Sequence, residues 1–189
     1  VAQHDMPMGG TSGPAKPGAM PELPKYVAEA IPIYTTSTGL GPFTKTITTA
    51  NPEAQALFTQ GMQMMDSFAK LDAVRSFRAA WQRDPNCAIC YWGEAWAWGS
   101  YLHGPILAEH SPFAYAAAKK ALALKMHAKL PWEQQFIDAI QVRYVEKFDA
   151  AKRMDQERAY ADVMKKVAEA LPDDLDAMTL YGDALFLLE

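Results

Sequence analysis

Two cysteines, Cys87 and Cys90, are the residues whose type and spacing most directly suggest chemistry. They are the only cysteines of the chain and lie in the stretch NCAICYWGEAWAWG, residues 86–99. Asn86 is predicted to cap a helix here, which places both thiols in its first turn, where unpaired N–H groups and the helix dipole favour a thiolate. A redox pair, a metal site, a local disulfide and two small buried residues are the alternatives.

The surroundings of this CxxC pair favour a structural role. The βαβ pattern of a thioredoxin-like protein is absent, and the two residues between the thiols are apolar. Covalent haem attachment needs a histidine directly after the second cysteine, where this chain has Tyr91. The imidazoles nearest in sequence, His103 and His110, match no recognised zinc spacing. We therefore expect a local disulfide between Cys87 and Cys90.

A second group of chemically capable residues lies near the amino terminus, in the stretch HDMPMGG. His4, Met6 and Met8 offer imidazole and thioether groups, which are copper ligands, the thioethers especially for Cu(I). Methionines in a Pro/Gly-rich segment also act as apolar anchors that fit irregular grooves. Docking onto protein is the preferred interpretation, and copper binding by these three residues is the alternative.

Composition and motifs exclude several classes of function. The net charge is -4, and no cluster of Lys and Arg forms a basic surface for nucleic acid. The longest apolar run is far shorter than the ~20 residues that span a bilayer. The chain has no Gly-rich phosphate loop, GxSxG or HExxH motif. We expect a non-catalytic protein that has no transmembrane segment and binds no nucleic acid.

The elements that must position these residues change character at residue 50. Residues 1–50 contain 6 of the 11 Gly and 7 of the 13 Pro, which predicts an extended arm. Within it, the β-branched stretches 31–36 and 42–49 are candidates for a short hairpin. A free arm of this composition buries too little surface to offset its chain entropy, so we expect it to lie against protein.

Residues 51–189 carry helical patterns. The pair Asn51 and Pro52 is a strong start signal for the first helix. Small residues that let two antiparallel helices approach, an aromatic residue and a terminating proline then follow at spacings of twelve, four, three and five. These residues are Gly61, Ala73, Phe77, Ala80 and Pro85. Their spacing resembles that of the tetratricopeptide repeat family.

The resemblance to tetratricopeptide proteins covers residues 51–189. It implies an all-α fold, a right-handed α-solenoid of about three and a half helix pairs, with an insertion at 100–112 and a last helix that has no partner. From Gly39 to Gly99 the chain also resembles exported bacterial proteins of this family that bear a Cys-Ala-x-Cys-Tyr-Trp-Gly segment. This narrower resemblance implies export, for example to the periplasm, and a binding role without an assigned activity.

We therefore expect a scaffold or accessory subunit that binds protein through the concave face, the 100–112 loop and the arm. The apolar residues 185–188 on the last helix must be covered, so a larger complex or a homo-assembly is predicted. The alternative is a periplasmic copper-binding or redox accessory protein that uses the His/Met arm or the CxxC pair. The expected partner-binding residues are Met64, Met65, Tyr101, His103, His110 and Leu187.

Overall fold

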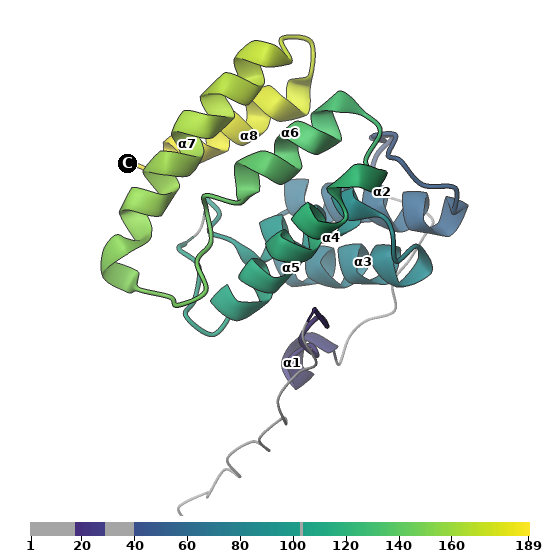
Figure 1. The fold of residues 1–189 in the computed structure, drawn as a ribbon, viewed down its shortest axis with the longest axis horizontal. Coiled ribbons are helices and arrows are strands. Elements are labelled where there is room, and N and C mark those ends of the chain that lie inside the picture. Colours follow the sequence, from purple (N-terminus) through teal and green to yellow (C-terminus); the bar gives the residue numbers. More distant parts are fainter. Residues whose placement is uncertain (1–17, 29–39, 103) are drawn as a thin grey trace, which may run out of the picture.

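The computed structural model describes residues 18–28, 40–102 and 104–189, and the regular secondary structure of these residues is helical, without strands (Figure 1). The α-helices are α1 (Lys25–Ala28), α2 (Pro52–Asp66), α3 (Lys70–Arg83), α4 (Ala88–Trp98), α5 (Ser111–Ala123), α6 (Pro131–Ile140), α7 (Arg153–Ala170) and α8 (Leu175–Phe186). Short 3-10 turns, Lys125–His127 and Ala150–Lys152, precede α6 and α7. The predicted all-α fold class is confirmed for the described residues.

The helix caps predicted from the sequence are present at the start of α2 and absent at the start of α4. The Asn51 side chain accepts hydrogen bonds from two N–H groups of the first turn of α2, and Pro52 is its first residue. The cap expected from Asn86 is wrong, because α4 begins at Ala88 with no side-chain cap. The N–H of Asn86 instead donates to the Asp84 carboxylate at 3.1 Å, which closes the preceding turn.

Consecutive helices pack against each other from α2 to α8, and α4 also contacts α2 and α6. Every residue of α4 is buried, including its two fully buried tryptophans, Trp92 and Trp98. A helix that is apolar over most of its surface must be enclosed on most sides, and α4 lies at the centre of the molecule (Figure 1). The aromatic residues of 86–99 are therefore part of the core.

The close helix approach predicted from small residues is present between the first three long helices. Phe77 of α3 is completely buried, and its ring lies against Gly61 of α2 and Gly93 of α4. A Cβ atom added at Gly61 or Gly93 would lie 2.6 or 2.4 Å from that ring. Only glycine fits these positions without displacement of the ring.

The described parts of the arm lie against the helices. Val27 and Ile47 are buried, with 0% and 5% of their surface exposed. Residues 42–49 form no strand, and the other half of the expected hairpin, 31–36, lies outside the described residues. Within the described part of the chain, no helix is both long enough and apolar enough to cross a membrane.

Candidate functional site

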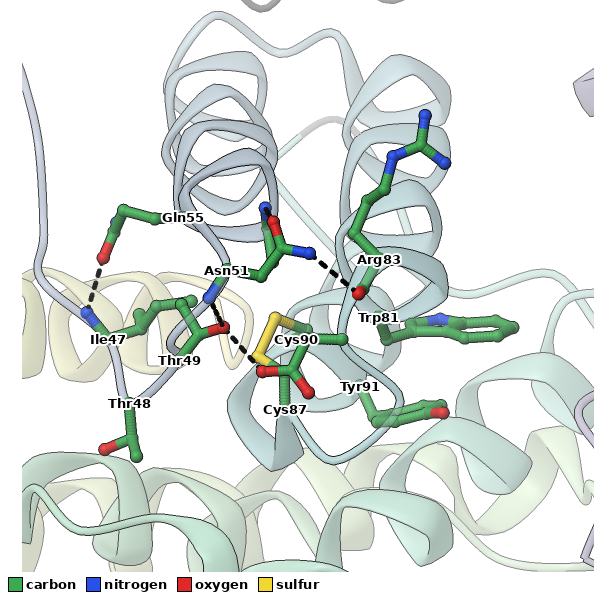
Figure 2. Close-up of a disulfide and its surroundings, with 12 residues drawn as sticks. Ile47, Thr48, Thr49, Asn51, Gln55, Trp81, Arg83, Cys87, Cys90 and Tyr91 are labelled. Atoms are coloured by element: carbon green, nitrogen blue, oxygen red, sulfur yellow. Dashed lines mark hydrogen bonds between the residues drawn. A yellow bond between two sulfur atoms is a disulfide. The ribbon is translucent and has the colours of Figure 1, made fainter.

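Cys87 and Cys90 form a disulfide at the start of α4 (Figure 2). Their exposed fractions are 1% and 0%. Beside it, Trp81 of α3 and Tyr91 of α4 stack with their ring centroids 4.8 Å apart. Thiol exchange requires a thiolate to reach one of the sulfur atoms, and burial of both denies that access. The buried position of the disulfide is that of a structural cross-link.

The segment just before α2 fastens distant helices to one another. The N–H and hydroxyl groups of Thr48 both donate to the buried Glu133 carboxylate of α6, each at 2.6 Å. The Lys45 ammonium group pairs with Asp174 and Asp176 at the start of α8, at 2.8 and 2.7 Å. This segment therefore holds the starts of α6 and α8 in fixed positions relative to α2.

The segment around α1 covers a different surface, formed by α3 and the start of α5. The Pro21 carbonyl accepts a hydrogen bond from Arg78 at 2.7 Å, and the Tyr26 hydroxyl lies 2.8 Å from the His110 Nε2 atom. Only 7% of His110 is exposed. Burial and the Lys70 charge lower the pKa of His110, against the opposing effect of Glu109, so its ring is neutral at pH 7.

Two adjoining cavities border the loop that follows α4. The smaller, of about 260 Å³, lies between α8 and the ends of α2 and α4, and the larger, of about 450 Å³, lies between this loop, the start of α7 and the end of α8. They share the residues Tyr101 and Leu102 of the loop that follows α4, and we call them together the inner groove. Its apolar walls are formed by Met65, Phe68, Trp96, Leu180, Phe186 and Leu187. Pockets with mostly apolar walls and a few convergent polar groups are typical binding sites.

Phe68 reaches the inner groove from an unusual backbone conformation. It follows the end of α2 with a φ of 61°, in the left-handed region that disfavours residues with a Cβ atom. The N–H groups of Phe68 and Ala69 donate to the carbonyls of Met65 and Met64, which is the Schellman pattern of helix ends. Glycine is the usual residue here, so the exposed phenyl ring, at 54%, is present despite a backbone cost.

Lys70, Asp66 and Asp183 give the smaller cavity of the inner groove its electrostatic character. Burial, Arg143 and Arg153 lower the pKa of Lys70 to about 8, although Glu157 opposes them. Its amino group donates to the Gly99 carbonyl and lies 4.7 Å from the Tyr101 ring centroid.

The two acidic residues of the smaller cavity, Asp66 and Asp183, both have raised pKa values. Burial and the charge of Asp176 raise the pKa of Asp66. Burial and Glu157 raise the pKa of Asp183, with Arg143 opposing them. A raised pKa means that the surroundings disfavour the charged form of each carboxyl group.

A buried ion triad supports the floor of the inner groove. Glu157 accepts hydrogen bonds from Arg143, at 3.0 Å, and from Arg153. Arg143 also donates to the Ser100 carbonyl at 3.0 Å, and Arg153 donates to the Arg143 carbonyl at 2.8 Å. Burial alone would raise the pKa of Glu157, but the two guanidinium groups outweigh it and lower that pKa. The triad fixes the loop after α4 against α7.

Three of the six expected partner-binding residues meet in the inner groove. Met65 and Tyr101 line the smaller cavity, and Tyr101 and Leu187 line the larger one. Met64 packs against the core instead and lines neither cavity. His110 also lies away from the lining, beneath the segment around α1.

The remaining expected residues fall in parts of the chain that the structure does not describe. His103 is one of them, and the predicted copper ligands His4, Met6 and Met8 are the others. Among the described residues, no group of three or more His, Cys, Asp or Glu side chains is arranged to hold a metal ion.

Sequence reasoning missed Lys70, Arg153 and Phe68. The first two are far apart in the chain, and nothing local indicates that the fold brings both to one groove. A signal for Phe68 was present, because a helix that ends without glycine or asparagine at this position is unusual.

Comparison of the chain with known protein families, with curated proteins and with solved structures gives no match.

Proposed function

We propose that this protein is a non-catalytic binding module of the tetratricopeptide kind, whose inner groove holds an extended apolar segment of a partner protein. The observation that carries this proposal is the convergence of Met65, Tyr101 and Leu187, from three separate parts of the chain, on one groove. Apolar walls supply affinity for side chains, and the flanking polar groups orient the bound backbone.

The repeat character is supported by two helices with equivalent apolar stripes. The stripe of α2 consists of Ala54, Leu57, Gly61 and Met64, and every member of the α4 stripe follows its counterpart by 34 positions. The members of the α4 stripe are Ala88, Tyr91, Ala95 and Trp98. In each case the following helix packs against the helix that carries the stripe, α3 on α2 and α5 on α4. A repeating helix pair of this period is typical of a right-handed α-solenoid.

A binding role fits the charges of the groove better than catalysis does. The Lys70 amino group, the strongest candidate nucleophile of the lining, already donates to the Gly99 carbonyl and faces the Tyr101 ring. An amine held in this way orients a ligand through its charge. A buried disulfide is also typical of exported proteins, which supports an extracytoplasmic location.

The experiment is selection of peptides from a displayed random library on the purified protein. Selected peptides should be rich in apolar residues, and Met65→Glu or Leu102→Asp should abolish their binding, because each places a charge in the apolar wall. The matched control is Met126→Glu, since Met126 is 75% exposed and lines neither cavity. Peptides that bind the two groove variants as well as they bind the control would contradict the proposal.

A further inference from the structure

Residues 18–28, which we call the strap, are held on the helices by a small number of contacts. The Val27 side chain is completely buried. Arg78 and Arg75 of α3 donate hydrogen bonds to the carbonyls of Pro21 and Val27, at 2.7 and 3.2 Å. The helix of the strap, α1, has only four residues. A short element of this kind lies at the low-stability end of a fold, where local opening occurs without global unfolding.

His110 lies beneath the strap. Only 7% of His110 is exposed, whereas Tyr26 of the strap is 53% exposed. The Tyr26 hydroxyl lies 2.8 Å from the His110 Nε2 atom, and the centroids of the two rings are 6.5 Å apart. The imidazole ring also packs against Trp98 of α4, with the ring centroids 4.8 Å apart. Tyr26 therefore covers a buried imidazole from the solvent side.

The hydrogen bonds around His110 suit a neutral ring and not a charged one. The Nδ1 atom is buried and has no hydrogen-bond partner among the described residues. A neutral ring can leave Nδ1 unprotonated while Nε2–H donates to the Tyr26 hydroxyl, which donates in turn to Glu109 at 3.3 Å. An imidazolium must carry a proton on both nitrogens, so its Nδ1–H group would be buried without an acceptor. The closed strap therefore disfavours protonation of His110.

The charges that face His110 act in the same direction on balance. Burial lowers the pKa of His110 most, and the positive charge of Lys70, at the start of α3, lowers it further. Glu109 opposes both, but its side chain is 67% exposed and its carboxylate lies 3.8 Å from Nε2. The neighbour from α4 is the uncharged Trp98 ring.

Other charged groups at this contact leave His110 as the residue that responds to mild acid. They are Arg75 and Arg78 of α3, with their ion-pair partners Asp72 and Glu94, and Glu22 and Lys25 of the strap. Arg75 and Arg78 hold the strap through backbone carbonyls, which do not titrate. Histidine is the side-chain type whose ordinary pKa lies between pH 5 and 8.

We propose that the strap is a proton-sensitive device, closed over His110 at neutral pH and opened in mild acid when His110 gains a proton. The closed state binds fewer protons than the open state, in which water solvates the imidazolium. Closure is therefore strongest above the ordinary histidine pKa of 6.5 and weakens as the pH falls from 6.5 to the lowered closed-state value. The strap lines neither cavity of the inner groove, so this inference does not depend on the function proposed for the groove.

Amide hydrogen exchange between pH 5 and 7 tests the strap. The reporters are the N–H groups of Val27 and Ala28, which donate to the Pro24 carbonyl and should exchange on opening, because a four-residue helix is not stable alone in water. Chemical exchange has its own pH dependence, so each rate is divided by the rate in His110→Gln at the same pH. This ratio should rise as the pH falls, by about tenfold for each pH unit between the open-state and closed-state pKa values.

Two variants complete the test. His127→Gln removes an exposed imidazole and should exchange as the wild type does. NMR of the imidazole rings should show that the pKa of His110 lies below 6.5 in the wild type and moves towards 6.5 in Tyr26→Ala, which removes the cover.

Three outcomes would overturn the proposal. The first is an exchange ratio that stays constant with pH, which would mean that His110 does not control the strap. The second is a wild-type His110 that titrates at pH 6.5 or above. The third is a loss of protection in α4 at the same pH, which would show that acid unfolds the whole protein.

Discussion

Phe68 illustrates, at the residue scale, a conflict between backbone preference and side-chain placement. Its left-handed conformation costs about 1 kcal/mol or more relative to glycine, yet the ring it carries forms part of the wall of the inner groove. Such strain at a cavity wall is the kind of outlier from which a functional role is inferred. Phe68 is therefore the residue whose replacement should separate stability from binding.

Two substitutions at Phe68 measure this separation. Phe68→Ala removes the ring and keeps the Cβ atom, whereas Phe68→Gly removes the ring and also the backbone cost. We expect Phe68→Gly to have a free energy of unfolding about 1 kcal/mol above that of Phe68→Ala in urea denaturation. Both variants should lose affinity for groove-binding peptides equally. Equal stability of the two variants would show that the backbone at this position is not strained.

Alanine substitution at Gly61 of α2 and at Gly182 of α8 should change the free energy of unfolding in opposite directions. At Gly61 the new methyl group meets the Phe77 ring, so overpacking of ~1–3 kcal/mol exceeds the gain of ~1 kcal/mol in helix propensity. At Gly182 the space is open, and the same substitution should raise the free energy of unfolding by up to ~1 kcal/mol. Thermal and urea unfolding of dilute protein checks both signs. A stabilised Gly61→Ala protein would contradict the close packing.

Lys70 should titrate well below an ordinary lysine. Its folded-state pKa is about 8 against 10.5 for a free side chain, because of burial and the charges of Arg143 and Arg153. Between these pH values the unfolded chain binds more protons, so the contribution of Lys70 to the free energy of unfolding rises with pH across this window. NMR of the lysine side chains should show a resonance that titrates near pH 8 and is absent from Lys70→Met. A Lys70 resonance that titrates above pH 10 would contradict the burial.

At the scale of elements, α4 and its disulfide act as the fixed centre of the fold. The helix is enclosed by its neighbours, and the cross-link lies at its first turn, away from the groove residue Trp96 at its other end. The disulfide closes only a short loop. Its effect on the entropy of the unfolded chain is therefore small, and packing supplies most of the rigidity of α4.

Replacement of both cysteines by alanine should lower the free energy of unfolding by only about 2 kcal/mol, from the entropy of a loop of this length. Peptide binding in the groove should remain unchanged. In the native protein, a thiol reductant should leave the disulfide intact, because both sulfur atoms are buried, and should reduce it after urea is added. Mass measurement after alkylation reports this difference. Rapid reduction without urea would indicate an accessible, exchangeable disulfide.

Prediction from sequence succeeded where the determinants are local or periodic. The cap at Asn51 and the fit of Phe77 against Gly61 depend on spacings within one helix or one helix pair. The Asn86 cap was wrong because Asp84, two residues earlier, competes for the same turn. The inner groove could not be derived, since its lining from Met65 to Leu187 depends on how α8 returns towards α2 and α4.

At the scale of the whole molecule, the ion triad connects α7 to the segments that follow α4 and α6. Glu157 of α7 holds Arg143, which follows α6, and through it the backbone of Ser100, which follows α4. Buried ion pairs contribute little net stability, but removal of one partner leaves an uncompensated charge. The triad therefore specifies one arrangement of these segments.

Glu157→Gln should lower the free energy of unfolding by roughly 3–5 kcal/mol, because two buried guanidinium groups lose their counter-charge. The matched control is Asp155→Asn, two residues earlier on α7, whose side chain is 80% exposed and should tolerate the change. The lowered pKa of Glu157 means that its stabilisation is complete above its ordinary value of 4.5 and is lost as the pH falls through the folded-state value. Equal urea midpoints for the two variants would contradict the burial of the triad.

Phe77 has a further consequence for how the molecule opens. One ring fills the space against glycines of both α2 and α4, so neither helix can separate from α3 without exposing the same side chain. The helices α2, α3 and α4 should therefore exchange their amide hydrogens through a single cooperative opening. Helices α7 and α8 do not contact this ring through a glycine, so we expect their amides to exchange in a separate opening. The two sides of the groove would then open independently of each other.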